Sequence, residues 1–388
     1  MEHLITSDFK LGIISGGQLG KMLALSASNW DVQTYILDPS SNCPASQVCT
    51  HLTQGSALCY DTLIEFGNKV DMIALEIENV NVDALIELKK RGKSIFPDPE
   101  ILRVIQDKGL QKQFYSTEKI PTSPYQLYEN EDEILQAFEK GELKLPFVQK
   151  TRTAGYDGKG VKLVKTDKEL KELLKGPSVI EELTNIKKEL AVIVARNTKG
   201  ETSCFPTVEM VFNEEVNLVE QLICPANIFE EIKEKAEKLS LLVAEKLSFE
   251  GILAVELFLT HDDELLINEV APRPHNSGHH TVEGTITSQY EQYLRAIFGF
   301  PLGDTSIKLP SVMINLLGEP NHFGKVKYEG VTESMALSGV KTHIYGKKET
   351  YPFRKMGHVT VMDKDINQAI LKANKVKQQL KVRAWKNL

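Results

Sequence analysis

The 388-residue sequence has no long apolar run, no excess of basic residues and no paired set of cysteines. No run approaches the ~18 apolar residues that a membrane-spanning helix needs, and the opening MEHLITSDFK lacks an apolar signal segment. A net charge of −7 argues against a nucleic-acid partner. The five cysteines lack metal-ligand spacing and predict free thiols in a reducing compartment. We therefore expect a cytoplasmic protein that binds neither membrane nor nucleic acid.

The chain has instead an ordinary globular composition, with 41% hydrophobic and 26% charged residues. Its length predicts two or three domains, at roughly 150 residues each. Apolar strands at 11–14, 33–37, 70–75 and 94–97 alternate with helical stretches at 21–28 and 82–91. This alternation predicts an α/β domain over residues 1–107.

A glycine-rich corner, SGGQLG at 15–20, joins the first strand to the first helix. Free backbone amides meet the positive end of a helix there, which favours an anion. Asp38 ends the next strand at the distance expected of a ribose-binding acid. The first glycine of a dinucleotide fingerprint would be Ser15, however, so a phosphate-bearing substrate is predicted rather than a nicotinamide or flavin.

Acidic residues follow the strand 70–75, in the sequence EIEN at 76–79. Such residues at the carboxyl end of a strand face the crevice of an open sheet. The alternative is that Asn79 caps the following helix and Glu78 is solvated.

A second glycine-rich stretch, TRTAGYDGKGV at 151–161, lies between strands predicted at 146–150 and 162–164. Its glycines let backbone amides approach phosphate oxygens, and a lysine supplies charge. It lacks the Walker spacing and no long helix follows. The alternative is an ordinary hairpin with a glycine turn.

The segment 265–279, LLINEVAPRPHNSGH, turns from an apolar strand into a polar, proline-stiffened loop. If its hairpin with strand 252–259 is centred between Asp262 and Asp263, Glu256 lies opposite Glu269 and Phe258 opposite Ile267. Opposed buried carboxylates ~5 Å apart repel each other, and a divalent cation, Mg²⁺ or Mn²⁺, would resolve the conflict. A shifted register would instead leave one glutamate in solvent.

Two further segments bear on the fold and the site. A helix is predicted at 285–298, and a cationic turn contains Lys347 and Arg354, with a solvated charge run as its alternative. The phosphate loop, the preceding Lys150 and the paired glutamates together predict ATP-dependent chemistry outside the P-loop class. Arg273, His275 and Asn276 predict stabilisation of a small transferred anion.

Several of these segments resemble a known family. GGQLGKM at 16–22, EIEN at 76–79, GYDGKGV at 155–161, INEVAPRPHNSGH at 267–279 and RKMGHV at 354–359 resemble, in this order, the N5-carboxyaminoimidazole ribonucleotide synthases of the ATP-grasp superfamily. The resemblance implies a three-domain α/β ATP-grasp fold: a Rossmann-like parallel-sheet domain at 1–107, a central subdomain at 108–185, and a C-terminal domain at 186–388 with a small closing segment from about 310. It also implies a homodimer.

The reaction implied by the resemblance belongs to de novo purine synthesis. ATP and bicarbonate form carboxyphosphate, which breaks down to CO₂ and phosphate. The exocyclic amine of 5-aminoimidazole ribonucleotide then captures CO₂ as a carbamate.

The resemblance also assigns residues to each ligand. Those for ATP are Lys108, Lys150, Gly155, Tyr156, Asp157, Gly158, Lys159, Gly160, Val161, Glu181, Glu182, Leu183, Thr184, Glu189, Asn268 and Glu269. Those for the ribonucleotide are Gln18, Leu19, Glu76, Asn79, Lys347 and Arg354. Glu256 and Glu269 would hold Mg²⁺. Arg273, His275 and Asn276 would bind bicarbonate and then carboxyphosphate, and Tyr156 and Asp157 would contact the aminoimidazole.

The sequence departs from the family pattern at Ser15, where the family has the first turn glycine, and at Lys108, Phe212 and Ala271, where arginine, histidine and asparagine are found in family members or other ATP-grasp enzymes. Three alternatives stay open. A formate-dependent glycinamide ribonucleotide transformylase normally has Asp where this chain has Asn276. A biotin carboxylase is normally longer. A catalytically silent nucleotide-binding regulator would not need Glu256, Glu269, Lys150 and Arg273 intact.

Overall fold

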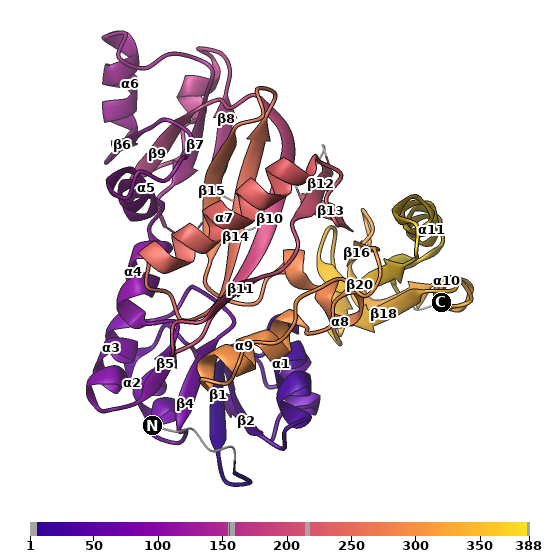
Figure 1. The fold of residues 1–388 in the computed structure, drawn as a ribbon. Helices are drawn as coiled ribbons and strands as arrows, with labels where there is room; N and C mark the ends of the chain where they lie inside the picture. Colours follow the sequence, from indigo (N-terminus) through magenta and orange to yellow (C-terminus); the bar gives the residue numbers. More distant parts are fainter. Residues whose placement is uncertain (1–5, 154, 156–159, 214–217, 386–388) are drawn as a thin grey trace.

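The structure is a computed structural model that describes residues 6–153, 155, 160–213 and 218–385. Figure 1 shows three parts: an N-terminal part at the bottom, a segment around β6–β9 at the top, and a C-terminal segment at the right. The large sheet that contains β10, β14 and β15 lies between them. In the described residues no helix is both long and apolar enough to cross a membrane.

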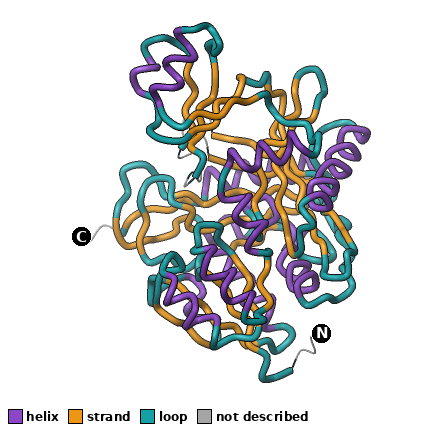
Figure 2. The backbone as a smooth tube through the Cα atoms, turned by 90° about the vertical axis from the view of Figure 1, so that its left-hand side faces the viewer, coloured by secondary structure: helices purple, strands orange, loops and turns teal. Residues whose placement is uncertain are grey.

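The N-terminal sheet is wholly parallel, in the order β3-β2-β1-β4-β5. Its strands are β1 (Lys10–Ile14), β2 (Gln33–Asp38), β3 (His51–Gln54), β4 (Met72–Leu75) and β5 (Ser94–Phe96). Its helices are α1 (Gln18–Ser28), η1 (Pro44–Gln47), α2 (Tyr60–Gly67), α3 (Val82–Lys90) and α4 (Pro99–Gln106). Leu11 and Ile13 pack with α1, while Ile14 packs with α2 and α3. Both faces are therefore covered, as a parallel sheet requires, and helices flank these strands in Figure 2.

The central sheet is antiparallel, in the order β6-β9-β7-β8. Its elements are α5 (Lys108–Thr117), β6 (Tyr125–Tyr128), α6 (Glu131–Glu139), β7 (Phe147–Thr151), β8 (Val161–Val164), η2 (Glu169–Glu172) and β9 (Ser178–Glu182). α5 begins at Lys108 because the Asp107 carboxylate accepts from the free backbone N–H groups of Gly109 and Leu110, at 2.7 and 3.2 Å.

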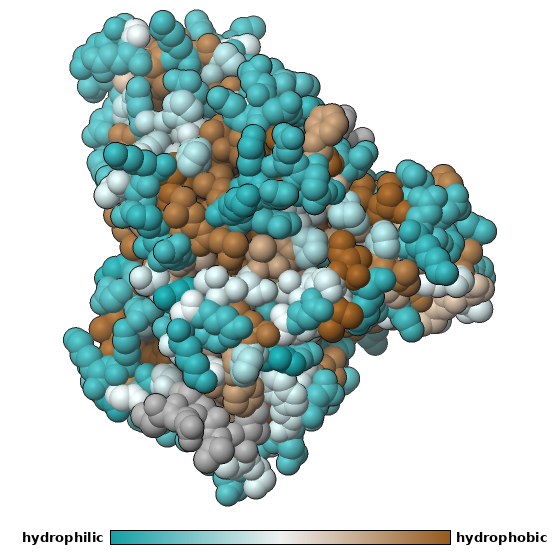
Figure 3. Space-filling view, viewed as in Figure 1, coloured by the Kyte–Doolittle hydropathy of each residue, from teal (hydrophilic) through white to brown (hydrophobic). Residues whose placement is uncertain are grey.

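The large sheet has the order β15-β14-β10-β12-β13-β16-β20-β18, with β11 beside β10. Its strands are β10 (Ile186–Arg196), β11 (Thr202–Cys204), β12 (Val208–Asn213), β13 (Leu218–Cys224), β14 (Gly251–Thr260), β15 (Leu265–Ala271), β16 (Ser311–Leu317), β18 (Val340–Ile344) and β20 (Lys355–Met362). α7 (Glu230–Lys246) packs on one face of this sheet, against Leu190 and Val192 of β10 and Leu257 of β14. In Figure 3 hydrophilic side chains cover the upper-right part of α7, and a hydrophobic area lies at its lower-left part.

The C-terminal segment closes the large sheet. α11 (Ile366–Gln379) packs against β16 and β20 through Ala369, Ala373 and Val376. β17 (Gly324–Glu329) pairs with both β19 (Glu349–Thr350) and β21 (Lys381–Ala384), and α10 (Val331–Met335) follows β17.

The helix predicted at 285–298 is wrong at its start. The structure has α8 (Thr281–Gly284), a break, and then α9 (Gln289–Ile297). The Thr285 hydroxyl bonds the carbonyls of Thr281 and Thr287, and the Ser288 hydroxyl accepts from the N–H of Glu291 at 3.1 Å. Hydroxyl groups that bond nearby backbone end one helix and begin the next.

α9 joins the N-terminal sheet to the large sheet, and in Figure 1 it lies between α1 and β14. Its residues share one core with Leu11 and Ile13 of β1 and Ile252 of β14. The buried Tyr293 hydroxyl accepts from the N–H of Leu75 at 3.2 Å and donates to the carbonyl of Phe96 at 3.0 Å. This packing brings the carboxyl ends of β1 and β4 toward the residues that follow β15.

Candidate active site

The β14–β15 hairpin places Glu256 directly opposite Glu269, which confirms that part of the predicted register. The predicted pairing of Phe258 with Ile267 is wrong, because Phe258 pairs with Leu266 and Leu257 with Ile267. The turn is one residue shorter than assumed, with the N–H of Thr260 bonded to the carbonyl of Glu264. A bulge at Asn268 offsets this difference, so the two carboxylates still meet.

The bulge has a structural result. Ile267 and Val270 both enter the core beneath α7, so Asn268 and Glu269 between them point to the other face. A regular strand would send those two neighbours to opposite faces. Two consecutive polar side chains therefore reach the groups contributed by the central sheet and α5.

Three lysines meet these groups. Lys108 of α5 forms an ion pair with Glu269, and Lys150 of β7 donates to Asn268 Oδ1 at 2.8 Å. Lys150 and Lys112 each lie 2.9 Å from one oxygen of the buried Glu181. Lys112 was not among the residues predicted from the sequence; its spacing of four residues from Lys108, on one helix face, is the signal that could have identified it.

The pKa values of these groups follow from burial and pairing. Burial opposes ionisation of Glu181, but Lys150 and Lys112 hold its pKa below the ordinary value. Burial lowers the pKa of Lys112 to about 8 despite Glu181. Burial also raises the pKa of Glu189 to about 7. The buried charges of this site are therefore stabilised by their ion-pair partners, which offset the cost of removing them from water.

The pKa values of the opposed glutamates are shifted in opposite directions. Burial and the negative charge of Glu269 raise the pKa of Glu256. Burial also acts on Glu269, but the ammonium of Lys108 outweighs it and lowers the pKa of Glu269. The two pKa values are therefore shifted in opposite directions, and a divalent cation would relieve the repulsion between the two carboxyl groups. The described residues hold no group of three or more His, Cys, Asp or Glu placed to hold a metal ion.

The loop after β15 supplies an imidazole, an amide and a guanidinium. His275 Nδ1 accepts from the N–H of Ser277 at 3.3 Å, and the Nε2 of the same ring lies 3.5 Å from Glu256 Oε1. Asn276 and Asn315 exchange hydrogen bonds between their amides, at 2.9 and 3.0 Å. Arg273 Nε lies 3.0 Å from Glu78 Oε1, so Glu78 pairs with a cation across the domain junction.

The glycine-rich corner carries a buried acid. Ser15 has a φ of 76°, the left-handed region that favours glycine, and its hydroxyl donates to Glu76 Oε1 at 3.0 Å. Burial raises the pKa of Glu76 to about 7, against the opposing effect of Arg273. Asp38 braces the turn by accepting from the N–H groups of Gly16 and Ser40, both at 2.8 Å. This geometry gives Asp38 a local structural role.

The other residues assigned to the ribonucleotide are spread over two regions. Gln18 begins α1, and the side chain of Leu19 packs in the core, so only its backbone could contact a ligand. Asn79 is exposed, and the cap of α3 is Asn81, not Asn79. Lys347 Nζ donates to the carbonyl of Lys355 at 2.7 Å, and Arg354 donates to the carbonyl of Glu349 at 2.6 Å.

The residues assigned to ATP are only partly placed. Tyr156, Asp157, Gly158 and Lys159 lie outside the described residues. Gly155 and Val161 flank them, and Gly160, at a φ of 79°, accepts from the N–H of Thr151 at 2.9 Å. Glu182 and Leu183 are exposed at the end of β9, and the Thr184 hydroxyl bonds Ser123 at 2.9 Å. Glu189 is paired with Phe258 in the sheet, beneath Lys150.

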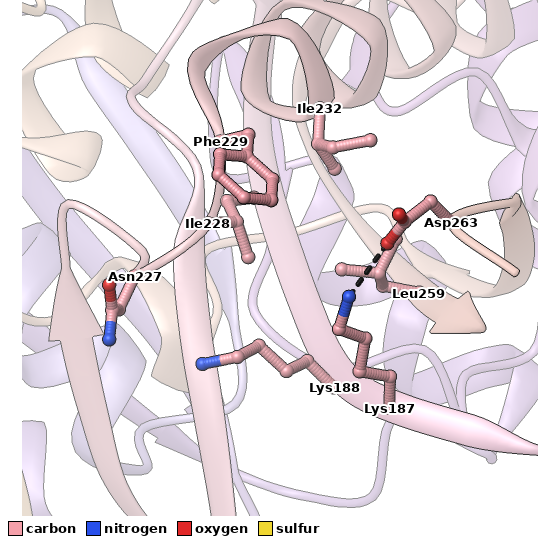
Figure 4. Close-up of a pocket in the computed structure, with 8 residues that line it drawn as sticks. All are labelled: Lys187, Lys188, Asn227, Ile228, Phe229, Ile232, Leu259 and Asp263. Carbon is pink, nitrogen blue, oxygen red and sulfur yellow. Dashed lines mark hydrogen bonds and ion pairs between the residues drawn. The ribbon is translucent and has the colours of Figure 1, made fainter. Parts of the chain in front are cut away.

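A separate pocket of about 210 Å³ lies on the opposite face of the large sheet. Figure 4 shows Ile228, Phe229 and Ile232 above it, while Lys187 pairs with Asp263 at 2.8 Å. Lys188 and Leu259 line this pocket, whereas their neighbours Glu189 and Phe258 point to the other face. The pocket therefore does not belong to the carboxylate cluster.

The chain resembles known proteins along nearly its whole length. Residues 9–106 match the ribonucleotide synthetase preATP-grasp domain, 113–290 the ATP-grasp domain, and 311–372 the phosphoribosylaminoimidazole carboxylase C-terminal domain. The chain is 38% identical to the N5-carboxyaminoimidazole ribonucleotide synthase of Bacillus subtilis, over 91% of each chain. Some relatives are longer: the chain spans 64% of the phosphoribosylaminoimidazole carboxylase of Vigna aconitifolia.

Solved structures show the same likeness. The synthetase from Thermotoga maritima has a TM-score of 0.89 at 41% identity, over 97% of this chain and 100% of that one. The Aspergillus clavatus synthase, solved with ADP and 5-aminoimidazole ribonucleotide, has a TM-score of 0.88 at 29% identity, over 96% and 99%.

The two sheets that enclose lysines and paired glutamates, behind a parallel-sheet domain, define an ATP-grasp ligase. Within that class, the chain matches N5-carboxyaminoimidazole ribonucleotide synthases along nearly its whole length. The chain belongs to the family of N5-carboxyaminoimidazole ribonucleotide synthases.

Proposed function

We propose that the cluster around Glu256 and Glu269 carries out the reaction of this family, the ATP-dependent carboxylation of 5-aminoimidazole ribonucleotide to N5-carboxyaminoimidazole ribonucleotide. The observation that carries the proposal is the opposed pair of glutamates, with Lys108 and Lys150 above it and His275 beside it. The complex of the Aspergillus clavatus relative with ADP and 5-aminoimidazole ribonucleotide supports the choice of substrates.

ATP would lie between the central and large sheets. Lys150, Lys108 and the loop 155–161 would hold its phosphates. The backbone at 182–183 would frame the adenine, with Glu181 and Thr184 beside it, and Glu189 would accept from the ribose hydroxyls. Glu181 would also fix Lys150, since the two form an ion pair at 2.9 Å. Asn268 would hold the same ammonium from the opposite sheet.

Glu256 and Glu269 would hold Mg²⁺, with Mn²⁺ as a substitute, which would neutralise phosphate charge during transfer. The chain's own part is to supply two opposed carboxylate groups. Ionisation of Glu256 must accompany binding, because its pKa is raised by burial and by Glu269.

Arg273, His275 and Asn276 would bind bicarbonate and then carboxyphosphate. A bicarbonate oxygen would attack the γ-phosphorus with loss of ADP, and the mixed anhydride would split into CO₂ and phosphate. Fixed donors aimed at the developing negative charge stabilise such steps more than flexible ones do. The guanidinium of Arg273, the Nε2 of His275 and the amide of Asn276 are the groups that this loop presents.

Glu76, with Gln18, Leu19 and Asn79, would bind the ribonucleotide at the glycine-rich corner, and Lys347 and Arg354 would hold its phosphate. The exocyclic amine would attack CO₂ and lose a proton to give the carbamate. Tyr156 and Asp157 are the candidates for contact with that amine.

Substrate dependence tests the proposal. ADP release should require 5-aminoimidazole ribonucleotide, and ¹³C from bicarbonate should appear in the product. Equal ADP release with formate and glycinamide ribonucleotide would favour the transformylase alternative instead. A homodimer, a cytoplasmic location and the domain boundaries at 107/108 and 185/186 stay predictions.

A further inference from the structure

The buried side chain of Gln289 bonds both backbone groups of His275. Its Oε1 accepts from the N–H of His275 and its Nε2 donates to the carbonyl of His275, both at 2.9 Å. The second N–H of the same amide points to His279 Nδ1 at 3.4 Å. Gln289 is itself fixed, because it begins α9, is fully buried, and donates its backbone N–H to the Thr281 hydroxyl at 2.8 Å.

The segment that Gln289 holds lies outside the strands of the described residues. β15 ends at Ala271, and the short helix η3 (Asn276–Gly278) begins only after His275. A strand residue would satisfy its N–H and carbonyl through a neighbouring strand. The Gln289 amide supplies the same two bonds from the core, so it fixes the point from which the His275 ring and the Asn276 amide project.

Gly278 packs closely against the side-chain amide of Gln289. A Cβ atom at this position would overlap the Oε1 of Gln289. The carboxamide is thus enclosed between the core and the loop that it holds.

We propose that Gln289 is a positioning residue for carboxyl transfer, which places His275 and Asn276 against the bicarbonate-derived anion. This inference rests on the proposed function of that loop. Gln289 acts through the His275 backbone and touches no substrate. Small displacements of a reacting group lower rates steeply, by roughly 100-fold for 1 Å.

The chain offers a matched control one turn later in the same helix. Gln292 is also fully buried, and its amide makes the same pair of bonds to Gly303, accepting at 2.8 Å and donating at 3.1 Å. Gly303 belongs to the connection between α9 and β16, away from the carboxylate cluster. Gln289 and Gln292 therefore differ in the loop that they hold and agree in burial and in the pair of hydrogen bonds to that loop's backbone.

The first experiment compares Gln289→Met with Gln292→Met. Both should lower the urea midpoint by similar amounts. Only Gln289→Met should lower kcat/KM for bicarbonate by about 100-fold, with KM for ATP changed by less than about threefold. Equal kinetic losses in the two variants, or no loss in Gln289→Met, would overturn the positioning role.

A second variant separates hydrogen bonding from packing. In Gln289→Glu a neutral carboxyl can accept from and donate to His275, whereas an ionised one cannot donate. Burial raises the pKa of such an acid. Activity relative to the wild type should therefore rise as the pH falls from 8 to 6, while the ratio for Gln289→Met stays flat. Gln292→Glu serves as the control for pH-dependent packing. A flat ratio for Gln289→Glu argues against the bonding role.

Hydrogen–deuterium exchange gives a readout that does not depend on the reaction. Amides in 275–279 should exchange at least tenfold faster in Gln289→Met than in Gln292→Met. Failure of the wild type to consume bicarbonate would refute the proposed function, but this exchange test would still stand. Unchanged exchange in Gln289→Met would refute the inference about Gln289 alone.

Discussion

Ser15 shows how a single residue combines strain with an interaction. At a φ of 76° a non-glycine residue is disfavoured by about 1–2 kcal/mol, yet its hydroxyl bonds the buried Glu76. The family pattern has glycine here, which avoids the strain but has no hydroxyl. The serine therefore has a strained backbone, and in return its hydroxyl fixes the orientation of the Glu76 side chain.

This balance predicts different effects for two substitutions at Ser15. Ser15→Ala keeps the strain and loses the hydrogen bond, so it should destabilise the protein by about 1–2 kcal/mol. Ser15→Gly also relieves the strain and should change stability by less than about 1 kcal/mol. Urea unfolding of both variants measures the difference. Equal losses would show that the left-handed conformation carries no cost here.

The Glu269 carboxylate carries a second prediction at this scale. Glu269→Gln should lower turnover by at least about 100-fold, because it removes a proposed metal ligand and the partner of Lys108. The protein should stay folded, as judged by circular dichroism. The control is Glu264→Gln in the same hairpin, where the side chain is exposed. Near-normal turnover of Glu269→Gln with Mg²⁺ would remove the metal role.

At the scale of elements, the sequence predicted the N-terminal α/β alternation and the pairing of Glu256 with Glu269. Apolar runs and the spacing between charged residues carried those predictions. It did not predict the bulge at Asn268 or the break before α9, since both depend on which backbone groups find partners in the folded chain. The Lys112–Glu181 pair was also missed, because it joins elements about 70 residues apart.

A group of histidines links the 275–280 segment to β20. The rings of His279 and His358 lie 4.6 Å apart, and both are fully buried. Burial lowers the pKa of each well below its ordinary value and lowers that of His280 to about 4. Below about pH 6.5 these histidines therefore bind protons in the unfolded chain but stay neutral in the folded protein.

This imbalance predicts acid sensitivity. Above about pH 6.5 these histidines should not change the free energy of unfolding. Below that pH the free energy of unfolding should fall by up to about 1.4 kcal/mol per pH unit for each histidine. Urea midpoints at pH 7.5, 6.5 and 5.5 measure this loss. The slope should be shallower in His280→Gln and unchanged in the exposed-site control His261→Gln. Identical slopes in His280→Gln and the wild type would show that protonation of His280 does not contribute to the loss of stability in acid.

At the scale of the whole molecule, the N-terminal sheet and the large sheet are not separate cores. α9 contributes to a cluster that also contains β1 and β14, and Trp30 of the N-terminal part packs on Phe298 and Phe300 at ring distances of 6.3 and 5.8 Å. Neither part can expose its share of this surface without the other. The two should therefore unfold together.

Tyr293→Phe tests this coupling. Loss of the hydroxyl leaves the N–H of Leu75 and the carbonyl of Phe96 without their partner, which should cost about 1–3 kcal/mol. Tryptophan fluorescence and far-ultraviolet circular dichroism should still report one coincident transition in urea. Separate transitions would mean that the N-terminal part unfolds on its own.

The bulge at Asn268 has a consequence for how such hairpins change length during evolution. The turn and the bulge shift the strand register by one residue in opposite directions, so they cancel at Glu256 and Glu269. A lineage that gained one turn residue could lose residue 268 and keep both carboxylates opposed. An alignment that penalises the insertion and the deletion separately would score these chains as divergent at the point where their acidic pair is the same.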